Sequence, residues 1–286
     1  MSFTTRDPNR ETYDLASETV EFETEDYPRR FSGVARLYGD AALQKFEHSH
    51  VTIVGIGGVG SWVAEALARS AIGHLTLIDM DHVSKSNTNR QIQAINTNYG
   101  KSKVYAMTER IRAIHPRCVI TQVDDFIDSN NLDVLLDVRC NFIVDAIDSV
   151  CAKTELIAWC IRRRVPIVTV GGAGGQLDPT RIHIDDLACT TQDPLLCKVR
   201  SRLRKHHGFP RQSKERFNVR AVYSDEPLIY PQVAACDLAR SAASGLHCAG
   251  FGSSVCVTGS FGFSAAAYVL NALTSSHSQT SPRFSA

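Results

Sequence analysis

Four glycines in a short segment form the first group of residues whose spacing suggests chemistry. The segment GIGGVG follows an apolar run, 50–54, and precedes residues 61–70, whose apolar positions recur at helical spacing. Glycine lets a backbone approach phosphates, and a helix N-terminus offers free N–H groups. The pattern alone fits NAD, FAD or ATP, and it also allows a glycine turn without ligand. The four positions are Gly55, Gly57, Gly58 and Gly60.

A dense group of polar and charged side chains follows the next apolar run, which ends at Asp79 with the spacing of a ribose-binding acid. Ligands bind at such strand ends in open α/β sheets. Arginine and lysine suit phosphate oxygens, and cleavage of the α–β bond of ATP needs such positive charge more than hydride transfer does. The alternative is a solvated loop. The further nucleotide-binding residues predicted here are Asp81, Asn87, Arg90, Gln91 and Lys103.

Two carboxylates follow the fourth apolar run, in the segment VDAIDS. A carboxylate beyond the end of a strand can hold Mg²⁺ against a triphosphate. We therefore assign Asp145 and Asp148 to the nucleotide site, and Asp148 also to the metal. Asp148, Arg90 and Lys103 are the predicted catalytic residues. The alternative for Asp148 is that it only caps the following helix.

Alternating strands and helices must position these residues. Short apolar runs predict strands at 50–54, 74–79, 118–123, 141–146 and 165–170, and helical periodicity predicts helices at 39–46, 61–70, 102–114 and 154–163. This alternation predicts an α/β fold with a Rossmann-like, doubly wound, mostly parallel sheet. Strands at 181–184 and 218–223 belong to an elaborated C-terminal half.

The composition bounds the organisation of the 286-residue chain, of which 43% is hydrophobic. We expect a mobile N-terminal tail over 1–28, an ATP-binding domain over 29–175, a C-terminal elaboration of the same compact unit over 176–273, and a flexible tail over 274–286. The nine cysteines form no Cys-x-x-Cys pair, and the start of the chain has no apolar signal segment. Both observations favour reduced thiols and a cytoplasmic protein.

A basic stretch lies between residues 198 and 220, where the only acidic residue is Glu215. The net charge of the whole chain is +1, so a nucleic-acid surface must be a local patch. The stretch suits a phosphate backbone, and tRNA is its natural partner; an ordinary surface helix is the alternative. The predicted tRNA-binding residues are Lys198, Arg200, Arg202, Arg204 and Lys205.

The segment 249–273 is apolar and has the length of a membrane span. Its many glycine and serine residues favour a buried loop followed by a final helix over insertion into a membrane. Peripheral membrane association through this segment is the alternative that the composition leaves open.

Several separate motifs together resemble the ubiquitin-activating-type adenylating superfamily. They are GIGGVG, LIDMD (77–81), SNTNRQ (86–91), Lys103 and DAIDS (145–149). The resemblance implies that the glycine loop holds ATP, that Asp79 takes the ribose, and that Asp148 organises Mg²⁺. It also implies that Asn87, Arg90 and Lys103 contact the phosphates and ribose.

Six further motifs resemble one branch of that superfamily, the tRNA threonylcarbamoyladenosine dehydratases. They are RFSGVARLYG (30–39), NRQIQA (89–94), GGAGGQLDPTRI (171–182), TQDPL (191–195), VYSDEP (222–227) and CAGFGSSVCVTGSFGF (248–263). The resemblance implies ATP-dependent dehydration, by cyclisation, of N6-threonylcarbamoyladenosine in tRNA through an acyl adenylate. It also implies a homodimer and allows sulfur-transfer proteins as partners.

Other functions remain as alternatives. The runner-up is an adenylyltransferase that activates the C-terminal glycine of a ubiquitin-like sulfur carrier. Such enzymes usually hold zinc with two Cys-x-x-Cys pairs, which this chain lacks. A dinucleotide-dependent oxidoreductase and a silent nucleotide-binding protein are weaker alternatives. Cys189 and Cys248 are expected to be bystanders, because the resemblance implies a nucleophile that is already tethered to the substrate.

Overall fold

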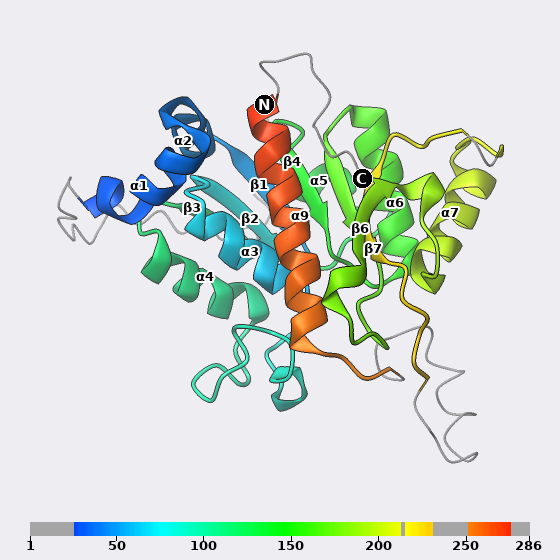
Figure 1. The fold of residues 1–286 in the computed structure, drawn as a ribbon, viewed down its shortest axis with the longest axis horizontal. Helices are drawn as coiled ribbons and strands as arrows, with labels where there is room; N and C mark the ends of the chain where they lie inside the picture. Colours follow the sequence, from blue (N-terminus) through cyan, green and yellow to red (C-terminus); the bar gives the residue numbers. More distant parts are fainter. Residues whose placement is uncertain (1–25, 213–214, 231–250, 276–286) are drawn as a thin grey trace, which may run out of the picture.

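The computed structural model describes residues 26–212, 215–230 and 251–275, and a seven-stranded sheet lies at its centre (Figure 1). All neighbouring strands run parallel except one pair at the edge of the sheet, which is antiparallel. The predicted α/β fold with a doubly wound, mostly parallel sheet is thereby confirmed. The strands, in sheet order, are β3 (Val119–Val123), β2 (His74–Ile78), β1 (His50–Val54), β4 (Phe142–Asp145), β5 (Ile167–Val170), β7 (Arg220–Ser224) and β6 (Ile182–Asp186).

The strand order creates a crevice between β1 and β4. From β1 the chain builds outward through β2 to β3, and it then returns to place β4 on the other side of β1. At such a reversal the connections leave in opposite directions, so the carboxyl ends of the two strands stay open to a ligand. Strands β6 and β7, from the C-terminal half, extend the same sheet.

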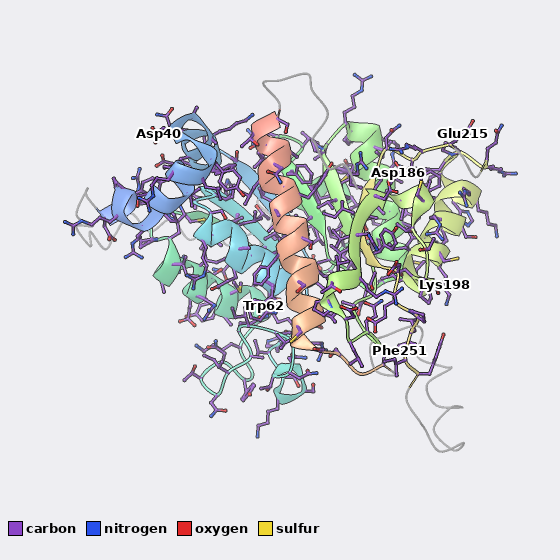
Figure 2. All side chains as sticks on the ribbon, viewed as in Figure 1. Asp40, Trp62, Asp186, Lys198, Glu215 and Phe251 are labelled. Atoms are coloured by element: carbon purple, nitrogen blue, oxygen red, sulfur yellow. The ribbon has the colours of Figure 1, made fainter. Side chains whose placement is uncertain are left out.

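One face of the sheet is covered by α3 (Gly60–Arg69), α4 (Lys103–Ile114) and the long α9 (Val255–Ser275), which crosses the front of the view in Figure 1. Small residues let α9 approach α3 closely. A Cβ at Gly262 would lie 2.7 Å from the Cβ of Trp62. The ring of Trp62, which is labelled in Figure 2, also meets that of Phe263 edge to face, with centroids 5.7 Å apart. At the end of this face lie α1 (Asp26–Tyr38) and α2 (Asp40–Glu47).

Helix α9 has the length and apolar composition of a membrane span, but 50% of its most apolar window is buried inside the protein. It packs on α3 and on the sheet. Its apolar character therefore belongs to the core, as expected for a final helix rather than an inserted span. The predicted loop before it is described only from residue 251 onward.

The opposite face is covered by α6 (Val150–Arg163) and α7 (Pro194–His206), with the short α5 (Leu132–Leu135) beside them. Helix α7 falls in the basic stretch, for which a surface helix was only the alternative interpretation. Its start has ordinary signals: Asp193 accepts a hydrogen bond from the backbone N–H of Leu196, and Pro194 occupies the first turn. The described connections include three short 3₁₀ turns: η1 (Lys85–Asn87), η2 (Pro179–Arg181) and η3 (Leu187–Cys189).

Two helices begin earlier than the sequence predicts. Helix α1 begins at Asp26, inside the segment expected to be a tail, and α6 begins at Val150, before the predicted start at 154. Apart from 26–28, the expected N-terminal tail lies outside the described residues, and so does the C-terminal tail beyond residue 275.

Candidate active site

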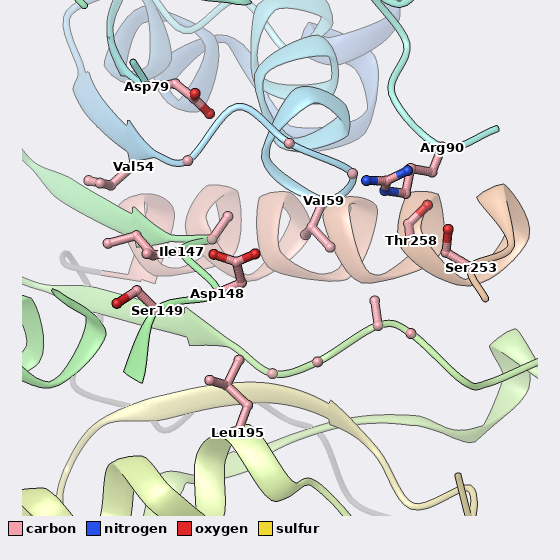
Figure 3. Close-up of a pocket in the computed structure, with 18 of the residues that line it drawn as sticks. Val54, Val59, Asp79, Arg90, Ile147, Asp148, Ser149, Leu195, Ser253 and Thr258 are labelled. Carbon is pink, nitrogen blue, oxygen red and sulfur yellow. The ribbon is translucent and has the colours of Figure 1, made fainter. Parts of the chain in front are cut away.

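A cavity of about 470 Å³ opens at the carboxyl ends of β1, β2, β4 and β5 (Figure 3). This volume is typical of sites for small molecules and cofactors. Ten of the predicted residues line it, whereas Gly60 and Asp145 do not. The ten are Gly55, Gly57, Gly58, Asp79, Asp81, Asn87, Arg90, Gln91, Lys103 and Asp148.

The glycine loop joins β1 to α3, and its glycines have different roles. Gly55 has a φ of 89°, a left-handed conformation that favours glycine. A Cβ at Gly60 would lie 1.8 Å from the carbonyl oxygen of Gly55, so Gly60 allows the helix to start against the loop. A Cβ at Gly57 would meet no atom within 4 Å. Gly57 therefore leaves open space beside the helix N-terminus, where a phosphate fits.

Asp79 ties the glycine loop to the end of β2. Its carboxylate accepts hydrogen bonds from the backbone N–H of Ile56, at 2.7 Å, and of Asp81, at 2.9 Å. Burial raises the pKa of Asp79, and the charge of Lys103 opposes that rise. Lys103 is nearly buried; its Nζ lies 2.7 Å from Asp81 and 3.6 Å from Asp79. The lysine is thus held at the edge of the cavity.

Arg90 lies beside the glycine loop. Its stem packs on Gly58, where an added Cβ would come within 3.1 Å of the arginine Cδ. Its guanidinium donates to the carbonyl of Ser86 and to the side chain of Asn89, at 3.0 and 3.1 Å. The indole of Trp62 donates to the Arg90 carbonyl at 2.9 Å. Helix α3 and the loop after β2 therefore fix both ends of this residue.

Asn87 and Gln91 support the same loop through their own side chains. Asn87 completes a capping box, in which its Oδ1 accepts from the backbone N–H of Ser84 at 3.0 Å. The Oε1 of Gln91 accepts from the Nε2 of Gln93 at 3.3 Å. Gln93 also donates to the Ile56 carbonyl, which links this loop to the glycine loop.

Asp148 presents an exposed carboxylate to the cavity and has no hydrogen-bond or ion-pair partner among the described residues. Figure 3 shows it near the glycine loop, together with Asp79 and Arg90. The residue at the N-cap of α6 is Ser149, and no side-chain hydrogen bond caps the helix. The helix-cap alternative for Asp148 therefore has no support in the geometry, and its carboxylate is available to a ligand.

The assignment of Asp145 to the nucleotide was wrong. As the last residue of β4, it accepts a hydrogen bond from Thr169 at 2.7 Å and lies 2.9 Å from the Nζ of Lys153. The side chains of Asp145 and Lys153 are both 0% exposed. The carboxylate is therefore committed to an internal ion pair between β4, β5 and α6, away from the cavity.

The residues at the far end of the cavity were not predicted individually from the sequence. It follows β5 at Gly171 to Gly174 and includes Gln176, Asp193 and Phe251. The carboxylate of Asp193 accepts from the backbone N–H of Gly172 at 2.9 Å, and burial raises its pKa. The signals in the sequence were the helix-start pair Asp193–Pro194 and the glycine-rich segment after a strand.

The predicted tRNA-binding residues fall on α7, but they differ in availability. Lys198, labelled in Figure 2, and Lys205 are exposed, with no partner among the described residues. Arg200 donates to Thr190. Arg204 donates to the carbonyl of Pro210 and stacks on Phe217, and the Nε of Arg202 is buried. The basic surface is therefore narrower than the sequence implied.

Of the two cysteines singled out earlier, the structure describes Cys189 alone. Cys189 is exposed at the end of η3 and does not line the cavity. Cys248 lies outside the described residues.

Comparison of the chain with known proteins agrees with this geometry. The model of the ThiF family matches residues 30–285, so the chain belongs to the ThiF family. It is 50% identical over 247 residues to the tRNA threonylcarbamoyladenosine dehydratase of Escherichia coli K12, covering 85% of this chain and 92% of that protein. Within the ThiF family, the chain therefore belongs with the tRNA threonylcarbamoyladenosine dehydratases.

Solved structures give the same result. The E. coli tRNA N6-threonylcarbamoyladenosine dehydratase in complex with ATP matches at a TM-score of 0.81 and 46% identity, over 90% of this chain and 99% of that chain. The same enzyme in complex with AMP matches at a TM-score of 0.82 and 46% identity, over 90% and 98%. Both a nucleoside triphosphate and a monophosphate thus occur in structures of this fold.

Proposed function

We propose that this chain uses ATP to remove one water from N6-threonylcarbamoyladenosine in tRNA and thereby forms its cyclic derivative. One observation carries the proposal. A single cavity joins a phosphate-binding end, built from the glycine loop, Arg90 and Lys103, to a second end beyond β5. ATP and a second reactant can therefore meet in it.

ATP binds at the first end. The glycine loop and the start of α3 receive the phosphates, and Asp79 accepts the ribose hydroxyls. Lys103 exchanges its hydrogen bond with Asp81 for one with a phosphate, because the Asp81 carboxylate is exposed and water can hydrate it when the lysine leaves. Arg90 supplies a second, planar cation beside the same loop.

The donor set suits Mg²⁺. Asp148 offers an unpartnered carboxylate beside the glycine loop, and no group of three or more His, Cys, Asp or Glu side chains among the described residues forms a metal cage. Mg²⁺ commonly takes one or two carboxylates and completes its shell with water and phosphate oxygens. When bound, it neutralises charge on the phosphates. Asp148 is the residue that would hold it.

The reaction follows from bringing the two ends together. The threonine carboxylate of the substrate attacks the α-phosphorus of ATP, and pyrophosphate leaves. The carbamoyl group of the same side chain then attacks the acyl carbon of the adenylate and expels AMP, closing the ring. Because this nucleophile is tethered, effective molarity supplies roughly 7 kcal/mol or more of the barrier. Arg90 and Lys103 stabilise the charge that develops on the phosphates.

The wider setting is also part of the proposal. Lys198 and Lys205 contact the tRNA backbone, the enzyme acts in the cytoplasm, and it forms a homodimer. Light scattering of the purified chain tests the dimer. A carrier-protein adenylyltransferase is not favoured by any feature of the cavity.

The decisive experiment incubates the purified chain with ATP, Mg²⁺ and tRNA that contains N6-threonylcarbamoyladenosine. Mass analysis of the digested nucleosides should show loss of one water, with AMP and pyrophosphate formed in equal amounts. Reactions without ATP, and with Lys103→Met, are the controls. Pyrophosphate–ATP exchange that requires a ubiquitin-like carrier and ignores the modified tRNA would refute the proposal.

A further inference from the structure

Gln176 is an unusual residue in the wall of the cavity. Its side chain is 2% exposed, and neither its Oε1 nor its Nε2 has a hydrogen-bond partner. A buried amide without partners destabilises the fold, because it has lost its hydrogen bonds to water without replacing them. Among the described residues with a buried, unpartnered polar side-chain atom, Gln176 alone lines the cavity. A ligand in the cavity can provide the missing donor and acceptor.

The backbone on both sides of Gln176 is held in place. The N–H of Gly175 donates to the carbonyl of Gly252, and the carbonyl of Gly175 accepts from Ile229, both at 2.8 Å. Gly175 has a φ of 74°, and a Cβ there would lie 2.9 Å from the ring of Phe251. On the other side, the N–H of Leu177 donates to the Glu226 carboxylate. Gln176 thus lines the cavity from a backbone that is held on both sides.

The chemistry of an amide limits what it can recognise. Its Oε1 needs a donor and its Nε2 needs an acceptor. Phosphate and carboxylate oxygens are acceptors only, so neither the triphosphate nor the threonine carboxylate can satisfy both atoms. A carbamoyl group carries an N–H and a C=O side by side. It can accept from Nε2 and donate to Oε1 at the same time.

The position in the sheet separates Gln176 from the nucleotide base. The ribose-binding Asp79 follows β2, whereas Gln176 lies beyond β5, with β1 and β4 between these two strands. Three inter-strand steps amount to roughly 14 Å. An adenine attached to a ribose at Asp79 therefore belongs to the opposite end of the cavity.

From this geometry we infer that Gln176 is the specificity-determining residue that recognises the carbamoyl group of the substrate. The inference rests on the proposed function and names the group read at the second end of the cavity. Through two hydrogen bonds, Gln176 distinguishes the threonylcarbamoyl side chain from an unmodified adenosine. It also orients the carbamoyl group toward the acyl carbon that it attacks.

The test measures the affinity for two tRNAs, one carrying N6-threonylcarbamoyladenosine and one unmodified at that position. In Gln176→Leu, the preference for the modified tRNA should fall roughly ten- to hundredfold, or to unity, while ATP affinity stays within twofold of wild type. Gln176→Glu, which keeps the shape but removes the donor, should also lose most of the preference. Gln44→Leu on α2, an exposed glutamine, should retain it.

Thermal stability separates recognition from a structural role. Removing an unpartnered buried amide should leave the Tm of Gln176→Leu unchanged or higher, whereas loss of a structural glutamine would lower it. A preference equal to wild type in both variants would overturn the inference, and so would a parallel loss of Tm and ATP affinity. Dehydration by the wild-type chain is measured first, so failure of the proposed function is recognised separately.

Discussion

Lys103 and Lys153 each form an ion pair with an aspartate near the carboxyl edge of the sheet, but their surroundings differ. Lys153 and Asp145 are both 0% exposed, and Thr169 completes their hydrogen bonding. Lys103 pairs with Asp81, whose side chain is 65% exposed. The exposed aspartate can release its lysine to a phosphate at little cost, whereas the buried aspartate cannot. Burial of the partner thus separates a charge that holds the fold from one that is available to a substrate.

The largest effect is expected from breaking the buried pair. Asp145→Ala leaves the Lys153 ammonium buried without a counter-charge and should lower the free energy of unfolding by about 3–5 kcal/mol. Denaturant unfolding measures the loss. The double variant Asp145→Ala/Lys153→Met removes both charges and should recover a large part of it. An unchanged free energy of unfolding in Asp145→Ala would show that the Asp145–Lys153 pair does not stabilise the fold.

Breaking the Lys103–Asp81 pair should affect activity more than stability. Lys103→Met should lower kcat/KM roughly 10²–10³-fold, because a cation aimed at the phosphates is lost. The free energy of unfolding should fall by less than it does in Asp145→Ala, because the Asp81 partner is 65% exposed and water can hydrate it. Lys101→Met removes a neighbouring lysine that pairs with Glu109 and is the matched control. If Lys103→Met lost as much stability as Asp145→Ala, the two lysines would not differ in the way proposed.

Asp148 extends the contrast to a carboxylate that has no lysine partner among the described residues. Asp148→Asn keeps its size but removes the charge, and roughly tenfold more Mg²⁺ should be needed for half-maximal activity. Titrating turnover with Mg²⁺ at saturating ATP measures this. Normal turnover at low Mg²⁺ in the variant would remove Asp148 from the metal site.

The raised pKa of Asp79 predicts a dependence on pH. A carboxyl group with a folded-state pKa above the ordinary 3.8 takes up a proton earlier on acidification than it does in the unfolded chain. Its contribution to stability is therefore full below the ordinary pKa and is lost as pH rises through the raised one. Ribose binding needs the carboxylate. ATP affinity should thus fall severalfold as pH drops through the raised pKa. Asp79→Asn should bind ATP more weakly than wild type, and its ATP affinity should depend less on pH.

Much of the scaffold could be predicted because its signals are local. Each predicted strand overlaps an observed one, and the glycine loop lies where the apolar run 50–54 predicted it. The polar residues after β2 could be assigned because the strand end alone places them. These inferences need only periodicity and the direction of the strands.

The failures have physical reasons. Whether Asp145 faces the cavity depends on the α6 residue that packs behind β4, and no local pattern reports Lys153 as its partner. The burial of Gln176 depends on distant segments around Gly252 and Ile229. Helix α7 could have been predicted from local signals, because its buried residues recur at helical spacing. These buried residues are Leu195, Leu196, Val199 and Leu203. The basic residues between them dominated the interpretation instead.

The smallest effect is expected on α7, where the same contrast separates two kinds of basic residue. Lys198 and Lys205 are exposed and unpartnered among the described residues, whereas Arg204 is held by the Pro210 carbonyl and the Phe217 ring. Each phosphate contact releases counterions and adds roughly 0.7–0.9 to the slope of log affinity against log salt. Lys198→Glu/Lys205→Glu should therefore weaken tRNA binding and flatten that slope by about one to two units.

Arg204→Met tests the other half of this contrast. Because its guanidinium is engaged inside the fold, the variant should lose stability and leave the slope nearly unchanged. Lys45→Glu, on the distant α2, controls for a change in net charge. ATP affinity should stay at the wild-type level in the double lysine variant, since α7 presents these lysines outside the cavity lining. Equal slopes for wild type and the double variant, together with a flatter slope for Arg204→Met, would reverse the assignment. The tRNA would then contact the arginine, and exposure alone would not identify the charges that bind it.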